Sequence, residues 1–101
     1  MLIYNVTTKV DWTIADDWVQ WMKEEHIPAV IATGSFLKYQ FVKLLQTDEE
    51  EGPTYAVQYF ATTQNEFDNY LKLYADALRK ETTEKWGNRF IAFRSLMEVV
   101  Q

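Results

Sequence analysis

The spacing of the apolar residues along this chain is the feature that most constrains its fold. Four segments, residues 2–10, 36–46, 54–61 and 89–100, alternate their side chains with the period of two that is typical of β-strands. Between them, residues 14–26 and 63–86 place apolar side chains three or four positions apart, as amphipathic helices do. The order of elements is therefore strand, helix, strand, strand, helix, strand.

This order predicts an α+β fold of the ferredoxin-like βαββαβ type, in which two helices cover one face of a four-stranded antiparallel sheet. The 101 residues contain no internal repeat, linker or low-complexity segment. Nearly half of them are apolar, which is enough to build one hydrophobic core at this length. We therefore expect a single domain over residues 1–101.

The first helix is expected to begin at Asp11 or Thr13, since either side chain can cap a helix N-terminus. Pro28 disfavours helical geometry in the residue before it, so we expect the helix to end at His26 and a new short helical turn to begin at Pro28 and to close at Thr33-Gly34. At helical spacing Glu25 would lie in the middle of the apolar side. That side is formed by Ile14, Ala15, Trp18, Trp21 and Met22.

The second helix begins with a capping-box pattern, Thr63 followed three residues later by Glu66. Thr82 and Thr83 are expected to weaken or bend this helix, and Gly87 to stop it. Its expected apolar face consists of Phe67, Tyr70, Leu71, Tyr74, Ala77 and Leu78.

The strands carry large apolar residues on both of their sides, whereas two helices can cover only one face of a sheet. The other face would expose a larger apolar patch than monomers usually tolerate. A second copy of the chain, packed sheet to sheet, is the natural cover. We therefore expect a homodimer formed through the open sheet face, which would be a dimeric α+β barrel.

Composition and charge exclude several classes of function. The chain has no cysteine, which removes disulfides and cysteine-ligated metals and fits a reducing compartment. Its net charge of −5 and its dispersed Lys and Arg residues argue against nucleic acid as a partner. No apolar run is long enough for a membrane span, and the first residues show no signal-peptide pattern. We expect a cytoplasmic protein with neither a nucleic-acid nor a membrane partner.

Four segments together resemble a family of short bacterial proteins described as domain of unknown function 4286: YNVT (4–7), WMKEEHIPAVIATG (21–34), TYAVQY (54–59) and AFRSLMEVV (92–100). The chain is also similar to the wider superfamily of dimeric α+β barrels. That superfamily includes cofactor-free monooxygenases, haem-degrading proteins and small isomerases. The resemblance implies the fold and the dimer, but it implies neither a catalytic residue nor a function.

His26 is the leading candidate for chemistry, because it is the only side chain whose ordinary pKa lies near neutrality. It follows an apolar helix face that bears Trp18 and Met22, and Glu25 stands beside it. The alternative is that the ring braces the backbone at the bend before Pro28, and this structural role is the favoured one. Burial and Glu25 would shift the pKa of His26 in opposite directions, so the sequence does not fix the sign of the shift.

Asn5, Gln58 and Arg94 are polar residues within otherwise apolar strands, so each must face solvent or find a partner. Arg94 could bind a carboxylate or enolate oxygen, although an ion pair with Glu98 or with an acid across the dimer is the favoured interpretation. A cavity among the aromatic residues would suit a flat apolar ligand. The candidate ligand-binding residues are therefore Asn5, Trp18, Met22, His26, Gln58 and Arg94.

No motif in the sequence marks a metal or cofactor site. A phosphate-binding glycine loop, HExxH, GxSxG and a multi-carboxylate constellation are all missing. We expect no metal and no cofactor. Two functions stay open: a non-catalytic module that binds a small apolar or aromatic ligand or a protein partner, and a cofactor-free enzyme, monooxygenase- or isomerase-like, that uses His26 as general base on an aromatic or enolisable substrate.

Overall fold

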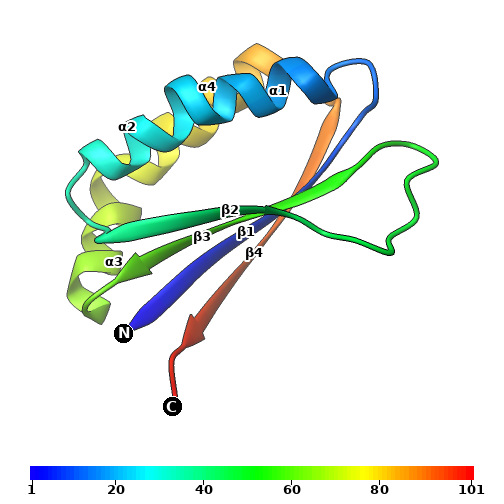
Figure 1. Cartoon of the computed structure of the whole chain (residues 1–101). Coiled ribbons are helices and arrows are strands. Elements are labelled where there is room, and N and C mark those ends of the chain that lie inside the picture. Colours follow the sequence, from blue (N-terminus) through cyan, green and yellow to red (C-terminus); the bar gives the residue numbers. More distant parts are fainter.

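The computed structural model describes all of residues 1–101 and has the ferredoxin-like fold that the order of elements predicts. Its strands are β1 (Leu2–Val10), β2 (Lys38–Lys43), β3 (Thr54–Ala61) and β4 (Phe90–Glu98). They form one antiparallel sheet in the order β2-β3-β1-β4. The helices lie together on one face of this sheet, and the other face is bare (Figure 1).

The helices form two long arms, each interrupted by one π-helical turn. The first arm consists of α1 (Ala15–Trp21), the π-helical turn η1 (Met22–His26) and α2 (Ile27–Ala32). The second arm consists of α3 (Gln64–Tyr70), the π-helical turn η2 (Leu71–Ala75) and α4 (Asp76–Trp86). Backbone hydrogen bonds in a π-helical turn span five residues, and such turns are frequent at functional sites.

The expected end of the first helix at His26 is wrong, because η1 carries the helix past Pro28. Ile27 keeps helical backbone angles (φ −60°, ψ −45°), and its N–H donates to the carbonyl of Met22, five residues back. Pro28 then lies in the first turn of α2. A residue without an N–H is tolerated there.

The π-helical turns also change which residues face the sheet. Each turn adds one residue to the helix, so the side chains beyond it no longer follow the α-helical pattern. Glu25 is exposed, and His26 takes the half-buried place on the inner side instead. In the second arm, Leu71 and Tyr74 are exposed while Ala75 is buried. The expected inner positions of Glu25, Leu71 and Tyr74 are therefore wrong.

The ends of the second arm agree better with the sequence. The Thr63 hydroxyl accepts a hydrogen bond from the backbone N–H of Glu66 at 3.2 Å, which confirms the N-cap. Gly87, at φ 63°, follows the last helical residue Trp86 and confirms the stop. Helix α4 continues through residues 82–83, where the Thr82 hydroxyl donates to the Leu78 carbonyl at 3.0 Å.

The capping of the first arm differs from the expectation. Neither Asp11 nor Thr13 caps α1, which begins four and two residues later, respectively, without a side-chain cap. Asp11 Oδ1 instead accepts hydrogen bonds from the backbone N–H of Thr13 at 2.8 Å and from its hydroxyl at 2.7 Å. Both residues therefore shape the turn that precedes the helix.

Strand β3 has the expected bounds, but β2 is shorter than residues 36–46, because the chain leaves the sheet at both of its ends. Phe36 turns into the core. Residues 44–53 form a loop that docks on the end of β1: the Val10 N–H donates to the Pro53 carbonyl at 3.0 Å, and the Trp12 indole donates to the Glu49 carbonyl at 2.7 Å. The acidic run is thus held against the end of the sheet.

The pairing of β1 with both of its neighbours sorts the strand residues onto two faces. Tyr4 pairs with Tyr59 and Leu96, and this set faces the helices, where Tyr4 and Tyr59 join the aromatic core. The next position, Asn5, pairs with Gln58 and belongs to the bare face. The aromatic core residues packed between helices and sheet are Tyr4, Trp18, Trp21, Phe36, Tyr59, Phe67, Tyr70 and Trp86.

The two ends of the chain lie side by side at one end of the sheet (Figure 1). The Val99 N–H donates to the Met1 carbonyl at 3.0 Å. This bond continues the β1–β4 pairing up to the first residue of the chain.

Candidate functional site

A cavity of about 380 Å³ lies between the helical arms and the inner face of the sheet. Strands β1, β3 and β4 contribute to its wall. The helical side of the wall comes from α1, η1, α2, the end of α3 and α4. Most of the lining is apolar. The lining residues are Tyr4, Val6, Thr8, Trp18, Met22, His26, Val30, Val57, Tyr59, Tyr70, Leu78, Arg79, Thr82, Thr83, Phe90, Ala92 and Arg94.

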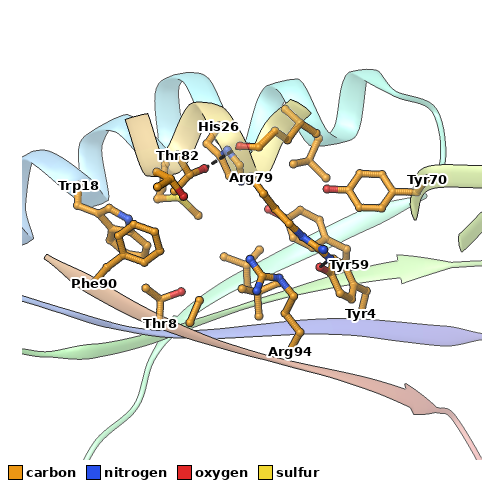
Figure 2. Close-up of a pocket in the computed structure, with 17 residues that line it drawn as sticks. Tyr4, Thr8, Trp18, His26, Tyr59, Tyr70, Arg79, Thr82, Phe90 and Arg94 are labelled. Carbon is orange, nitrogen blue, oxygen red and sulfur yellow. Dashed lines mark hydrogen bonds between the residues drawn. The ribbon is translucent and has the colours of Figure 1, made fainter. Parts of the chain in front are cut away.

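The cavity has two chemically different ends (Figure 2). Trp18 and Phe90 lie together at one end, which is aromatic. Arg79 and Arg94 lie at the other end beside tyrosines of the sheet and of α3. His26 lies on the helical side between the two ends. A ligand that fills the cavity would therefore meet both apolar and cationic surfaces.

His26 enters the cavity because η1 turns it, rather than Glu25, towards the sheet. Its ring stacks on Trp21 with centroids 5.0 Å apart and planes inclined by 27°. Neither ring nitrogen makes a hydrogen bond within the chain, so the imidazole does not brace the backbone. Burial, and secondly the positive charge of Arg94, lower the pKa of His26 from 6.5 to about 4. The ring is therefore neutral at pH 7.

The cationic end is built around a hydrogen bond between helix and sheet. Arg79 Nη2 in α4 donates to the hydroxyl oxygen of Tyr4 in β1 at 3.1 Å. Burial, together with nearby Tyr4, raises the pKa of Tyr70 to about 12, and burial also raises the pKa of Tyr59 above its ordinary range. These phenols are therefore uncharged at neutral pH. Arg94 is exposed and forms no ion pair within the chain.

The aromatic end contains an unsatisfied donor. Trp18 is only 2% exposed, and its indole N–H has no hydrogen-bond partner. Figure 2 shows the ring nitrogen turned towards the interior of the cavity. Thr47 Oγ1 and Trp86 Nε1 are buried without a partner as well, although neither residue lines the cavity, so the unpaired indole N–H of Trp18 does not by itself mark the position of a ligand atom.

Four of the six candidate ligand-binding residues come together here: Trp18, Met22, His26 and Arg94 all line the cavity. Asn5 and Gln58 do not line the cavity, because they lie on the bare face of the sheet, at opposite positions of the neighbouring strands β1 and β3. Asn5 is also hydrogen-bonded to Thr7 at 3.0 Å. The alternation of side chains along a strand separates Asn5 from the cavity by a single position.

Arg79 is the charged residue of the cavity wall that sequence reasoning missed. It follows η2, so the α-helical pattern of the second arm gives no sign that it faces the sheet. A pattern shifted by one residue after Tyr70, with Ala75, Leu78, Thr82 and Trp86 facing inwards, would have placed Arg79 beside the cavity.

The arrangement suits organic ligands better than metal ions. Nowhere in the structure do three His, Cys, Asp or Glu side chains come together as a set that could bind a metal ion. The hydrogen-bonding groups of the cavity are guanidinium, phenol, indole, imidazole and hydroxyl groups. No helix has the length and apolar character needed to cross a membrane.

The fold and the cavity define a ferredoxin-like α+β protein with a hollow between helices and sheet. Residues 1–100 match the family described as domain of unknown function (DUF4286), and the chain belongs to this family. The resemblance seen in the four sequence segments is thereby confirmed. No curated protein matches the sequence.

Solved structures support the same fold. A mutant of SnoaB, a cofactor-independent oxygenase from Streptomyces nogalater, is similar with a TM-score of 0.72 at 10% identity, over 99% of this chain and 94% of that one. HapK from Hahella chejuensis is similar with a TM-score of 0.71 at 13% identity, over 99% of this chain and 93% of that one. A dimeric ferredoxin-like protein from an uncultured marine organism has a TM-score of 0.67 at 13% identity, over 99% of this chain and 96% of that one. At these identities the similarity concerns the fold alone.

Proposed function

We propose that this protein binds a small, largely apolar or aromatic molecule in the cavity between its helices and its sheet. The observation that carries the proposal is the cavity of about 380 Å³, whose mainly apolar lining includes Trp18, His26 and Phe90. That volume is in the range of small-molecule sites, and a mainly apolar lining with a few polar groups is typical of them.

A screen of aromatic compounds by thermal shift tests this proposal, with Trp18→Phe and Trp12→Phe as paired variants. Trp12 is 52% exposed and lies outside the cavity, so its replacement controls for the loss of a tryptophan. We expect a bound compound to raise the melting temperature and to shift the Trp18 indole N–H signal in NMR spectra. Trp18→Phe should weaken binding, and Trp12→Phe should not. The proposal fails if no compound binds or if binding depends equally on both residues.

A second candidate is a cofactor-free enzyme in which His26 accepts a proton from an aromatic or enolisable substrate. It is favoured by an unpaired, neutral imidazole within the same cavity. The fold similarity to a cofactor-independent oxygenase is consistent with it. His26→Gln should then abolish turnover of a substrate that it still binds. If compounds bind but none is converted in air by the unmodified protein, the enzyme hypothesis is excluded for those compounds.

Two further properties belong to this proposal. A homodimer through the bare face of the sheet is supported by the exposed apolar residues Ile91, Phe93 and Met97 on that face. A similar solved structure is that of a dimeric ferredoxin-like protein. A cytoplasmic location is proposed because the chain lacks cysteine.

A further inference from the structure

The charged groups around the cavity have a single sign, although the chain as a whole is acidic. The net charge is −5, yet the lining contains two arginines, Arg79 and Arg94, and no aspartate or glutamate. Neither arginine forms an ion pair within the chain. Asp76, one turn earlier in α4, acts on Arg79 through its charge, but it forms no ion pair with Arg79 and does not line the cavity. Two guanidinium groups at the rim of a region of low dielectric constant therefore attract an anion.

The neighbouring hydroxyl groups are arranged to donate as well. Arg79 donates to the hydroxyl oxygen of Tyr4, which leaves the Tyr4 hydroxyl proton available for a ligand. Tyr59 and Tyr70 also keep their protons, because burial raises their pKa values. None of the three donates a hydrogen bond within the chain. This end of the cavity therefore presents guanidinium and phenol donors, which suit negatively charged oxygen atoms.

The opposite end suits flat rings rather than more charge. Trp18 and Phe90 are both drawn at that end in Figure 2, and both line the cavity. Thr8 adds a hydroxyl group near Phe90, but no charged side chain is labelled at that end (Figure 2). A ligand with several charged groups would leave some of them in contact with apolar side chains, which is costly.

We propose that the ligand is an aromatic acid with a single negative charge, whose carboxylate lies between Arg79 and Arg94 and whose rings contact Trp18 and Phe90. This inference rests on the proposed function, because it names the class of ligand for the same cavity. The carboxylate would be the ion-pair partner that the two guanidinium groups lack within the chain, and each of its oxygens can accept hydrogen bonds from them.

Three probes of the same shape and different charge test the proposal: naphthoate, naphthylmethanol and naphthylmethylamine, titrated into the full chain by calorimetry at pH 7. We expect naphthoate to bind at least about tenfold more tightly than the neutral alcohol, as one or two charge-assisted hydrogen bonds would provide. The amine should bind most weakly. Added salt should weaken naphthoate binding and leave alcohol binding unchanged.

Single substitutions then locate the anion. Arg94→Gln should reduce naphthoate affinity by about tenfold and leave naphthylmethanol affinity unchanged, since only the charged interaction is lost. Arg89→Gln makes the same change of charge outside this cavity and is the matched control. Arg79 also donates a hydrogen bond to Tyr4, so two substitutions are compared there. Arg79→Gln removes the positive charge, whereas Arg79→Lys keeps the charge and removes the paired N–H donors of the guanidinium group.

The outcomes separate this inference from the proposed function. If the acid and the alcohol bind equally to the unmodified protein, the cavity binds apolar molecules and the anion inference is overturned. If Arg89→Gln weakens naphthoate as much as Arg94→Gln does, the attraction comes from overall charge, and the inference is again overturned. If none of the three probes binds, the proposed function loses its support as well.

Discussion

His26 shows how a single residue links the site to stability. Its pKa is lowered to about 4 by burial and by Arg94, whereas an exposed histidine titrates near 6.5. Between these two values the unfolded chain binds a proton that the folded chain does not. The free energy of unfolding therefore rises with pH through this window and falls as the pH is lowered from about 6.5 towards 4.

His26→Gln should flatten this pH dependence, because glutamine does not titrate. We expect the melting temperature of the unmodified protein, relative to that of His26→Gln, to be highest above pH 7 and to fall as the pH is lowered to about 4, where the contribution of neutral His26 is lost. Thermal melts at closely spaced pH values measure this. Parallel curves for the two proteins would show that the imidazole titrates normally in the folded state.

At the scale of elements, the extra residue in η1 decides whether Glu25 or His26 faces the sheet. Deleting Glu24, an exposed residue of η1, should convert the π-helical turn into an ordinary α-helical one. His26 would then follow Trp18 by seven residues, or almost two full turns at about 100° per residue, and would still face the sheet. We expect this variant to fold with a melting temperature no lower than that of the unmodified protein.

The matched control is deletion of Glu81, an exposed residue of the regular helix α4. Helix α4 contains no inserted residue at this point, so the deletion rotates every later side chain by about 100° around the helix axis, and Trp86 leaves the core. A fall in melting temperature for this deletion but not for the first would confirm that η1 is an insertion in an α-helix. Similar losses in both would contradict it.

The same π-helical turns explain which parts of the structure could be predicted from sequence. The strands have a period of two and no insertions, so the sequence shows which residues of β1 and β4 share a face, although apolar residues on both sides leave open which face meets the helices. The arms do not keep one period, so Glu25 and Tyr74 were assigned to the wrong side. For the site, Trp18 precedes η1 and was placed correctly, whereas Arg79 follows η2 and was missed.

Pairing register decides the remaining site residues. Asn5 is directly opposite Gln58 and Ser95, so Arg94 cannot share a face with Asn5. Sequence alone does not give this register, because the relative alignment of β1 and β4 depends on contacts between residues about ninety positions apart. The cavity itself arises from how the two arms pack, which no local pattern describes.

For the whole molecule, the bare face of the sheet makes association the main expectation. Phe93 is 66% exposed there and pairs in register with Thr7. We expect sedimentation at micromolar concentration to give a dimer rather than the 12.0 kDa monomer. Phe93→Glu should shift the protein towards the monomer, because it places a charge in the contact.

Tyr74→Glu is the matched control, since Tyr74 is an exposed aromatic residue on the helical layer. It should leave the oligomeric state unchanged. A monomer for the unmodified protein, or equal dissociation by both substitutions, would contradict a dimer formed through the bare face.

The hydrogen bond between Met1 and Val99 makes the backbone almost a closed ring. A short peptide link between the two ends would span little distance and would disturb neither β1 nor β4. Such circularisation would leave the native contacts as they are, while restricting the conformations open to the denatured chain. The stability gained would be entropic, and it would grow with the logarithm of the number of residues enclosed.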